Sequence, residues 1–301
     1  MSEPARKWLL AIMQALTSLC LVMLVLRQLD FGHALATLRR GTLAWLAAAI
    51  ALYNLSQLAS ARRFHAYLRQ AGMPVSQAEN LALYYSAMFL NLFLPGGIGG
   101  DGYKVLVLAR RAKASLRKLL AISLADRAGG LLALLALLLL LAAWLAARDA
   151  PWPAACCAAA ALAACALSFV LHRRLFGMDA RSVARIIGLG LAVQLLQLAC
   201  MAMLLAWLEV PGSQWRAFLA LFLASSVAAA LPLSIGGLGA REVTFLYGLP
   251  LLQLDPAPGV LASALFFLIT ALSALPGAWL LTLTAAAPAP ARQRQPCKGW
   301  R

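Results

Sequence analysis

Six mostly apolar runs, each about 20 residues long, constrain the fold of this chain more than any other feature. A helix of about 20 residues crosses the ~30 Å hydrocarbon core of a membrane. The runs are Trp8–Leu26, Leu43–Ser60, Ala128–Ala147, Pro153–Leu171, Ile186–Leu208 and Val260–Thr284. Charged residues make up only 12% of the 301 residues and hydrophobic residues 63%, whereas a soluble domain carries about 25% charged residues. The sequence therefore predicts an all-α, polytopic membrane protein and excludes a soluble enzyme or a secreted disulfide module.

Two shorter apolar runs, Leu81–Leu94 and Ala217–Leu233, end in proline and glycine. Such segments are typical of re-entrant elements, whose broken backbone is tolerated only inside protein or beside a wet cavity. We therefore expect six full transmembrane helices and two re-entrant helical elements.

An internal repeat links these elements. The segment from Pro95 to Lys104 recurs from Pro232 to Arg241 as P-x-x-I-G-G-x-G-x-[KR], displaced by 137 residues. The same displacement carries the first three spans onto the last three. Three crossings in each half predict an inverted repeat, in which a site between the halves lies near the membrane midplane. We expect repeat 1 over residues 1–148, repeat 2 over 149–286 and a disordered basic tail over 287–301. Packing or loop flexibility is the alternative role for the glycines.

The charge distribution predicts an orientation. The formal net charge is +16, and the basic residues cluster between apolar runs, as cytoplasmic loops do in membrane proteins. With both termini cytoplasmic, 19 of the 26 Lys and Arg residues lie on the inside. Arg27, Arg39 and Arg40 in the first outer loop oppose this rule. The pattern lacks a basic surface on a soluble fold, so we expect no nucleic-acid partner.

The candidate site follows from the glycine turns and the few ionisable residues near them. Backbone N–H groups in glycine-rich turns can hold anions, and lysine and arginine bind phosphate. We expect Asp101, Asp126 and Glu242 to balance the neighbouring cations Lys104, Arg127 and Arg241, and Ser226 to add a hydrogen bond to a bound phosphate group. The predicted substrate-binding set is Asn91, Gly99, Gly100, Asp101, Lys104, Asp126, Arg127, Ser234, Gly236, Gly237, Arg241 and Glu242. For the Asp126-Arg127 dipeptide the alternative is an interfacial snorkelling pair, and for Asn91 and Ser226 a helix–helix hydrogen bond.

Catalytic signals are missing from the sequence. The three histidines, His33, His65 and His172, fall in segments that we interpret as loops or polar stretches, without an H-E-x-x-H pattern. The sequence contains no G-x-S-x-G nucleophile elbow and no phosphate-binding Walker loop. The cysteines form no C-x-x-C pair. We therefore expect no catalytic residue, no metal and no cofactor, and do not expect an enzyme.

The same motifs carry a resemblance to a known family. The run from Asn91 to Asp101, followed by Lys104, resembles the signature of the lysylphosphatidylglycerol synthase transmembrane-region family, also called flippase-like proteins. Asp126-Arg127 and the segment from Leu231 to Glu242 are similar to the later motifs of that family. In its two-domain members such a module moves an aminoacylated phospholipid to the outer leaflet, and a separate soluble domain makes that lipid by transfer from tRNA. The soluble domain has no counterpart in this sequence, and Leu238 stands where the first motif has Asp101.

The resemblance and the residues together predict a lipid translocator in a bacterial inner membrane, acting on a lipid with a phosphate-bearing or other polar head group. The expected partners are the lipid substrate, the anionic phospholipid surface, and a second copy of the chain or a lipid-modifying enzyme. One alternative is an integral membrane transferase or hydrolase with Asp101 or Asp126 as base. Another is a partner of a lipid-modification or glycosyltransferase system that does not itself transport.

Overall fold

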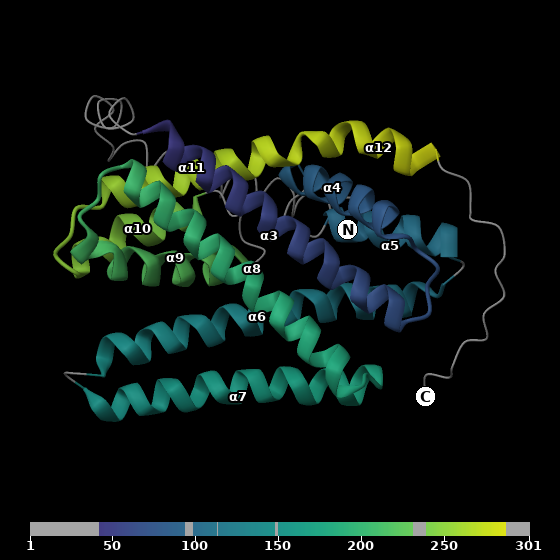
Figure 1. Ribbon diagram of the computed structural model, residues 1–301, viewed down its shortest axis with the longest axis horizontal. Coiled ribbons are helices and arrows are strands. Elements are labelled where there is room, and N and C mark those ends of the chain that lie inside the picture. Colours follow the sequence, from purple (N-terminus) through teal and green to yellow (C-terminus); the bar gives the residue numbers. More distant parts are fainter. Residues whose placement is uncertain (1–41, 94–98, 113, 148–149, 231–238, 287–301) are drawn as a thin grey trace, which may run out of the picture. The chain divides into compact units, whose positions relative to one another are not determined.

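The computed structural model describes residues 42–93, 99–112, 114–147, 150–230 and 239–286, and every regular element in these ranges is a helix (Figure 1). This confirms the all-α prediction. The α-helices are α3 (Leu43–Gln70), α4 (Gln77–Phe93), α5 (Gly99–Ala112), α6 (Leu116–Ala146), α7 (Pro151–Phe176), α8 (Ala180–Trp207), α9 (Trp215–Ala230), α10 (Ala240–Leu251), α11 (Ala257–Ala274) and α12 (Pro276–Ala286). A short 3-10 helix, η2 (Gly212–Gln214), precedes α9.

Five candidate membrane spans have the length and hydropathy needed to cross a bilayer. They are Leu43–Gln70, Leu116–Ala146, Pro151–Phe176, Ala180–Trp207 and Ala257–Thr282. They contain or overlap five of the six predicted runs, and the chain is therefore a multi-pass membrane protein. The sixth run, Trp8–Leu26, lies outside the described residues.

Two of these helices extend well beyond the apolar runs that predicted them. α3 continues past Ser60 to Gln70, and α6 begins at Leu116 instead of Ala128. At the start of α6, Ser115 caps the helix by accepting a hydrogen bond from the backbone N–H of Lys118 (3.3 Å), as N-cap residues do. The added turns contain buried ionic groups, which end an apolar run in the sequence without ending the helix.

The last predicted span, Val260–Thr284, consists of two helices. α11 ends at Ala274 and α12 begins with Pro276. Proline has no backbone N–H and is tolerated in the first turn of a helix but not in its interior. Pro276 therefore accounts for the break between the two helices.

Helix bounds recur with the displacement found in the sequence. Moving α3 by 137 residues gives 180–207, which are the bounds of α8. The same step carries α4 to 214–230, next to α9 at 215–230, and α5 to 236–249, which overlaps α10 at 240–251. Each described pair of helices flanks one glycine motif. The turns at 94–98 and 231–238 lie outside the described residues, so the re-entrant geometry and the inverted orientation stay predictions.

The described residues form two compact units. Unit 1 contains residues 42–54, 90–93, 99, 196–230 and 239–273, and unit 2 contains 55–89, 100–112, 114–147, 150–195 and 274–286. Each unit combines segments from both halves of the sequence. The division into repeats at residue 148 and the disordered tail stay predictions.

Unit 2 packs α3, α6 and α8 around one hydrophobic core, and α6 and α7 lie side by side (Figure 1). Phe64 and Leu68 of α3 and Ile122 of α6 are at most 1% exposed. In this unit α4 begins with a capping box: Glu79 accepts a hydrogen bond from the Ser76 backbone N–H (2.8 Å), and the Ser76 hydroxyl accepts one from the Glu79 N–H (3.2 Å).

Aromatic residues form the core of unit 1. The rings of Phe218 and Phe245, from α9 and α10, have centroids 6.4 Å apart. The rings of Phe222 and Phe266 lie closer, at 5.0 Å in an edge-to-face arrangement. Such pairs stabilise by about 0.5–1.5 kcal/mol beyond the area that they bury, so they fix α9 against its neighbours.

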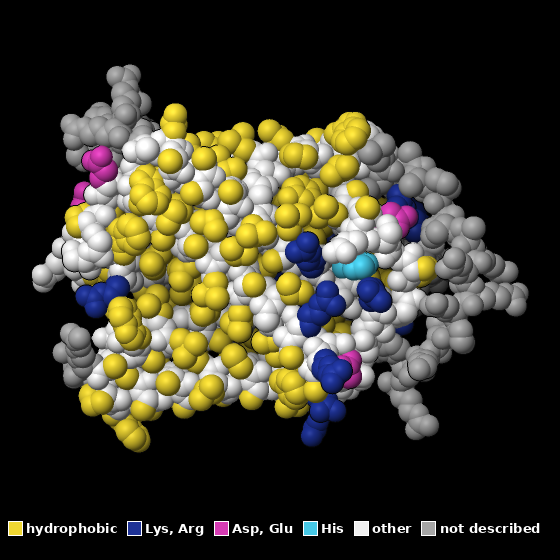
Figure 2. Space-filling model, viewed as in Figure 1, with side chains coloured by type: hydrophobic (Ala, Val, Ile, Leu, Met, Phe, Trp, Pro, Cys, Tyr) yellow, Lys and Arg dark blue, Asp and Glu magenta, His cyan; other side chains and the backbone are white. Residues whose placement is uncertain are grey.

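The surface of α6 and α7 suits a lipid environment. Leu124, Trp144 and Leu162 are 69%, 59% and 70% exposed. Figure 2 shows a largely hydrophobic face on which Lys and Arg side chains gather where α7 ends and α8 begins. The basic residues at this end of the two helices are Arg173, Arg174, Arg181 and Arg185. In the expected orientation this basic end is cytoplasmic.

Candidate functional site

The first glycine motif continues directly into α5, and its acidic residue holds two cations. Asp101 lies in the first turn of α5. Its Oδ1 atom is 2.6 Å from the Lys104 Nζ, and its Oδ2 atom accepts a hydrogen bond from the Arg127 Nε. Although burial opposes ionisation, the two cations keep the pKa of the Asp101 carboxyl below its usual range. The pairing of Asp101 with Lys104 is as predicted, and Arg127 is an additional partner.

The two cations around Asp101 differ in accessibility. The Lys104 side chain is 5% exposed, whereas the Arg127 side chain is 40% exposed. The Lys104 ammonium also lies 4.2 Å from the centroid of the Phe64 ring and 5.3 Å from that of Tyr84, positions that favour a cation. Lys104 is therefore fixed inside unit 2, and Arg127 is the member of the cluster that a ligand can reach.

Asp126 forms its ion pair with Arg63 of α3, so the predicted pairing with Arg127 is wrong. The Arg63 Nε lies 2.7 Å from the Asp126 Oδ1, and the two side chains are 7% and 9% exposed. Successive residues of a helix point about 100° apart. Asp126 therefore faces the helix interface while Arg127 faces Asp101. The pair lies ~10 Å from the end of α3 and ~15 Å from the start of α6.

Two glycines make room for the Arg63 guanidinium. A Cβ atom added at Gly130 would lie 3.3 Å from its terminal nitrogens, and one added at Gly190 would lie 3.4 Å from Nη1. Nη1 is buried and has no hydrogen-bond partner among the described residues. The helices therefore leave space for a planar cation that is held through its Nε.

Sequence reasoning missed Arg63 because it follows the apolar run of α3 and resembled the start of a cytoplasmic loop. A usable signal is present. Ser56, Ser60, Arg63 and Tyr67 recur every three or four residues, which places them on one helix face. All four are at most 7% exposed. A polar stripe along an apolar helix indicates a buried polar interface.

His172 also differs from its prediction, since it lies inside α7 and not in a loop. It is 4% exposed. Its Nδ1 lies 2.5 Å from the Ser168 carbonyl oxygen, and its Nε2 is hydrogen-bonded to the Tyr67 hydroxyl. The Ser168 carbonyl can only accept, so Nδ1 is the donor in that bond, and the Tyr67 hydroxyl also donates to the Ala125 carbonyl oxygen (3.4 Å). A Cβ atom at Gly129 would lie 3.3 Å from the Tyr67 hydroxyl oxygen, so a larger residue there would require this pair to shift by a few tenths of an ångström.

Unit 1 contains the second basic residue of the repeat, Arg241, at the start of α10. Its Nη1 donates a hydrogen bond to the Ser226 hydroxyl (2.9 Å), a contact between α10 and α9 of the kind given as the alternative role for Ser226. The guanidinium carbon lies 5.2 Å from the centroid of the Phe222 ring and 5.0 Å from that of Phe266. Two aromatic faces and one neutral hydroxyl thus hold this cation.

Glu242 does not form the predicted ion pair with Arg241 among the described residues. Its Oε2 accepts the backbone N–H of Gly239 (2.7 Å), and its Oε1 accepts the Ser263 hydroxyl (2.8 Å). Glu242 is 5% exposed. Since neighbouring side chains on a helix diverge, Glu242 closes the first turn of α10 and ties it to α11, while Arg241 faces α9.

The predicted site residues are thus distributed over two clusters. Unit 2 brings together Asp101, Lys104 and Arg127, and places Asp126 on Arg63. Unit 1 contains Arg241, Glu242 and the half-buried Asn91. Gly99 and Gly100 begin α5. Ser234, Gly236 and Gly237 lie outside the described residues. A joint binding site for all of these residues stays a prediction.

The described residues contain no group of three or more His, Cys, Asp or Glu side chains that could hold a metal ion. Ion pairs among the described residues join arginine and lysine side chains to the carboxylates of Asp101 and Asp126. Fold and charge clusters together define a helical multi-pass membrane protein with ionic groups buried between apolar helices.

The family model described as "Lysylphosphatidylglycerol synthase TM region" matches residues 9–277. The chain belongs to this family, which confirms the resemblance seen in its motifs. Membership fits a membrane protein related to lipid modification or translocation. The comparison with curated proteins found no match.

Proposed function

We propose that this chain moves a lipid with a phosphate-bearing head group between the leaflets of a bacterial inner membrane. The observation that carries the proposal is the charge around the first glycine motif. One carboxylate, Asp101, is shared by two cations, Lys104 and Arg127. Ionisable groups in membrane proteins are costly and are usually paired or line a pathway. The surplus positive charge of this cluster is complementary to an anionic head group.

Arg127 is the residue proposed to bind the head group first. It is the exposed member of the cluster, and its Nε is the donor that contacts Asp101. A guanidinium has five N–H donors in a planar fork, and this fork suits the oxygens of a phosphate. Arg127 can therefore bind a phosphate while Asp101 keeps its side chain in place.

Arg241, which the repeat matches to Lys104, is proposed to bind the head group in the second half. It has no carboxylate within ion-pair distance among the described residues, and its hydrogen-bond partner is the neutral Ser226. Arg241 is half-buried, and a partly desolvated cation without a carboxylate partner carries a desolvation cost that a bound anion reduces. Arg127 in the first half and Arg241 in the second would give the head group a place to bind from either leaflet.

The proposal involves no covalent chemistry on the lipid, and we propose that the chain is not an enzyme. The two carboxylates considered as bases, Asp101 and Asp126, are both in ion pairs. The cations that lie 2.7 Å from Asp126 and 2.6 Å from Asp101 occupy carboxylate oxygens that a general base needs in order to reach its proton. This favours translocation over the transferase alternative.

Leaflet exchange in proteoliposomes tests the proposal. Vesicles would carry lipids labelled on anionic or zwitterionic head groups, with wild type, Arg127→Gln, Arg241→Gln or the control Arg174→Gln. Arg174 is exposed and lies at the basic end of α7. Charge-assisted hydrogen bonds are worth about 1.5–3 kcal/mol, so each site variant should slow exchange at least tenfold while the control stays within twofold.

Mass spectrometry of the same vesicles separates transport from chemistry. The proposal requires exchange of the anionic lipid with its mass unchanged. Equal rates for wild type and both site variants, in protein of matched folded yield, would refute the assigned residues. A covalently altered lipid would support the transferase reading instead.

A further inference from the structure

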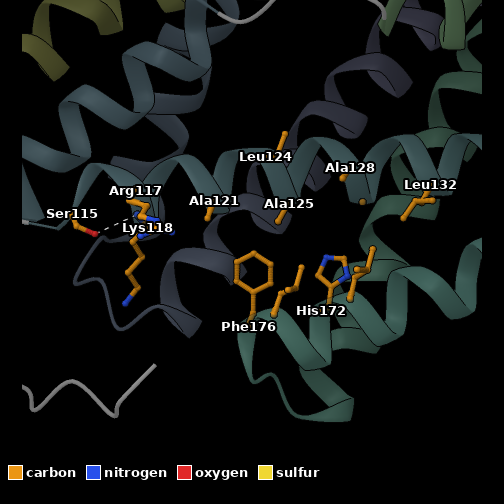
Figure 3. A pocket seen from close by; sticks show the side chains of 13 residues that line it. Ser115, Arg117, Lys118, Ala121, Leu124, Ala125, Ala128, Leu132, His172 and Phe176 are labelled. Carbon is orange, nitrogen blue, oxygen red and sulfur yellow. Dashed lines mark hydrogen bonds between the residues drawn. The ribbon is translucent and has the colours of Figure 1, made fainter. Parts of the chain in front are cut away.

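A groove between α6 and α7 lies on a different face of α6 from Asp126 and Arg127. Its volume is about 680 Å³, within the range of small-molecule binding sites. It runs along the first half of α6 and the last turns of α7 (Figure 3). Its apolar lining includes Ala121, Leu124, Ala128, Leu132, Leu175 and Phe176.

One end of the groove is cationic. Ser115, Arg117 and Lys118 line it there, as Figure 3 shows. The Lys118 Nζ donates a hydrogen bond to the Ala71 carbonyl oxygen (3.0 Å), which holds the ammonium at this end. Arg117 is exposed. The N-terminus of α6 adds the positive end of its helix dipole. An anion is therefore favoured at this end by two side chains and by the helix.

The rest of the groove suits hydrocarbon. Its interior polar side chain is His172, and both nitrogens of that ring already have partners, the Tyr67 hydroxyl and the Ser168 carbonyl. A ligand in this part of the groove would find leucine, alanine and phenylalanine side chains and no unpaired ring nitrogen. Because a polar ligand group would lose its hydrogen bonds there, an apolar chain is favoured.

The length of the groove matches one leaflet. Arg117 and Leu132 are ~22 Å apart along α6, and half of a bilayer measured with its head groups is ~20–22 Å. The exposed leucines of α6, with Leu124 69% exposed, show that this face is open to the bilayer in the described part of the chain. A molecule with an anionic group at the interface and a chain of leaflet length fits both ends of the groove.

We propose that this groove binds one anionic phospholipid, with the phosphate on Arg117 and Lys118 and an acyl chain between α6 and α7. None of the residues proposed to bind the translocated head group lines it. The site is therefore separate from the proposed translocation residues and does not depend on the proposed function. Its occupant would be a resident lipid that fills the seam between two transmembrane helices.

Photo-crosslinking tests the proposal. Purified full-length chain in bilayer nanodiscs would be mixed with phosphatidylglycerol or phosphatidylcholine probes that carry a diazirine on one acyl chain. Mass spectrometry would then locate the labelled peptides. The expected result is phosphatidylglycerol labelling on residues 121–132 or 171–176, with at least fivefold less labelling by phosphatidylcholine.

Two variants and their controls distinguish a specific site from a basic surface. A basic residue near an anionic membrane contributes about 1 kcal/mol, or roughly a fivefold change. Arg117→Gln should therefore reduce labelling about fivefold, whereas Arg173→Gln, at the same end of the helices but outside the lining, should not. Ala121→Trp should block the groove, and the neighbouring exposed Leu120→Trp should leave labelling intact.

Four results would overturn the proposal. Equal labelling by the two lipids would show ordinary bilayer contact. An equal loss in Arg117→Gln and Arg173→Gln would show a diffuse charge effect. Unchanged labelling in Ala121→Trp would show that the acyl chain does not lie in the groove. Crosslinks from the groove to the run Trp8–Leu26 in place of lipid would identify that segment as the occupant instead.

Discussion

Replacing Arg63 by methionine should destabilise the protein far more than the same change at its neighbour Arg62. The Arg63 guanidinium lies 2.7 Å from Asp126, with both side chains more than 90% buried. Removing it leaves an unpaired carboxylate between helices. Breaking a buried ion pair from one side costs about 3–5 kcal/mol. Arg62 is exposed, and an exposed substitution changes stability by no more than about 0.5 kcal/mol.

The assay is equilibrium unfolding in mixed micelles, in which an increasing fraction of denaturing detergent is followed by tryptophan fluorescence. Asp126→Leu should lower the free energy of unfolding by a similar amount to Arg63→Met, since it leaves the Arg63 cation unpaired. The double variant should recover most of the loss, because apolar residues of similar size can replace a buried pair at little cost. The two single losses should then exceed the double loss by several kcal/mol.

This reasoning is wrong if Arg63→Met and Arg62→Met unfold at the same detergent fraction. It is also wrong if the losses of Arg63→Met and Asp126→Leu simply add in the double variant. The first result would mean that Arg63 reaches water in the membrane. The second would mean that the two side chains stabilise the fold independently.

Three further predictions concern local contacts. The Ser76 backbone N–H at the start of α4 lowers the pKa of Glu79 in the folded protein. The stability that Glu79 adds is therefore complete above pH ~4.3, the unfolded pKa, and is lost as the pH falls through the lower pKa of the folded state. Since Glu79 is exposed, wild type should exceed Glu79→Ala by only about 0.5 kcal/mol at pH 6, and an unfolding titration at pH 3 that still shows this gap would contradict it. Gly277→Ala should lose about 1–3 kcal/mol, because its Cβ would meet the backbone of α4; Gly188→Ala, with open space around it, is the control and should melt no lower than wild type. Ser263→Ala should cost about 1–3 kcal/mol by removing the hydroxyl that donates to buried Glu242 (2.8 Å), and an unchanged melting temperature would contradict that bond.

Membrane spans were predictable because hydropathy is a local property of the chain. The sequence predicted all five described spans, but it did not predict where α3 ends or where α6 begins. Ser60 and Ala128 marked the limits of apolar runs, whereas the helices continue to Gln70 and begin at Leu116. A charged residue ends a hydropathy run whether or not it has a buried partner. The partner is a tertiary property, and it decides where the membrane helix ends.

The candidate site was predictable in its residue types and only partly in its pairings. Asp101 and Lys104 are three residues apart on a helix, a spacing that brings side chains together. The contacts of Asp126 with Arg63 and of Glu242 with Ser263 join different helices. Adjacent opposite charges suggested ion pairs that the helix geometry does not allow. Contacts between helices can be predicted only when the packing of the helices is known, and a single sequence does not give that packing.

The Arg63–Asp126 pair also constrains how the chain enters the membrane during synthesis. Its members are 63 residues apart. At about 5–20 residues per second, Arg63 leaves the ribosome roughly 3–13 s before its carboxylate partner. An arginine at the centre of an inserting helix costs about 2.5–3.5 kcal/mol, and Arg63, ~10 Å from the end of α3, costs less. During that interval the arginine reaches toward the head groups, as long basic side chains do. The C-terminal third of α3 therefore settles to its final depth only when α6 has been inserted, so the two helices complete their membrane integration as a unit.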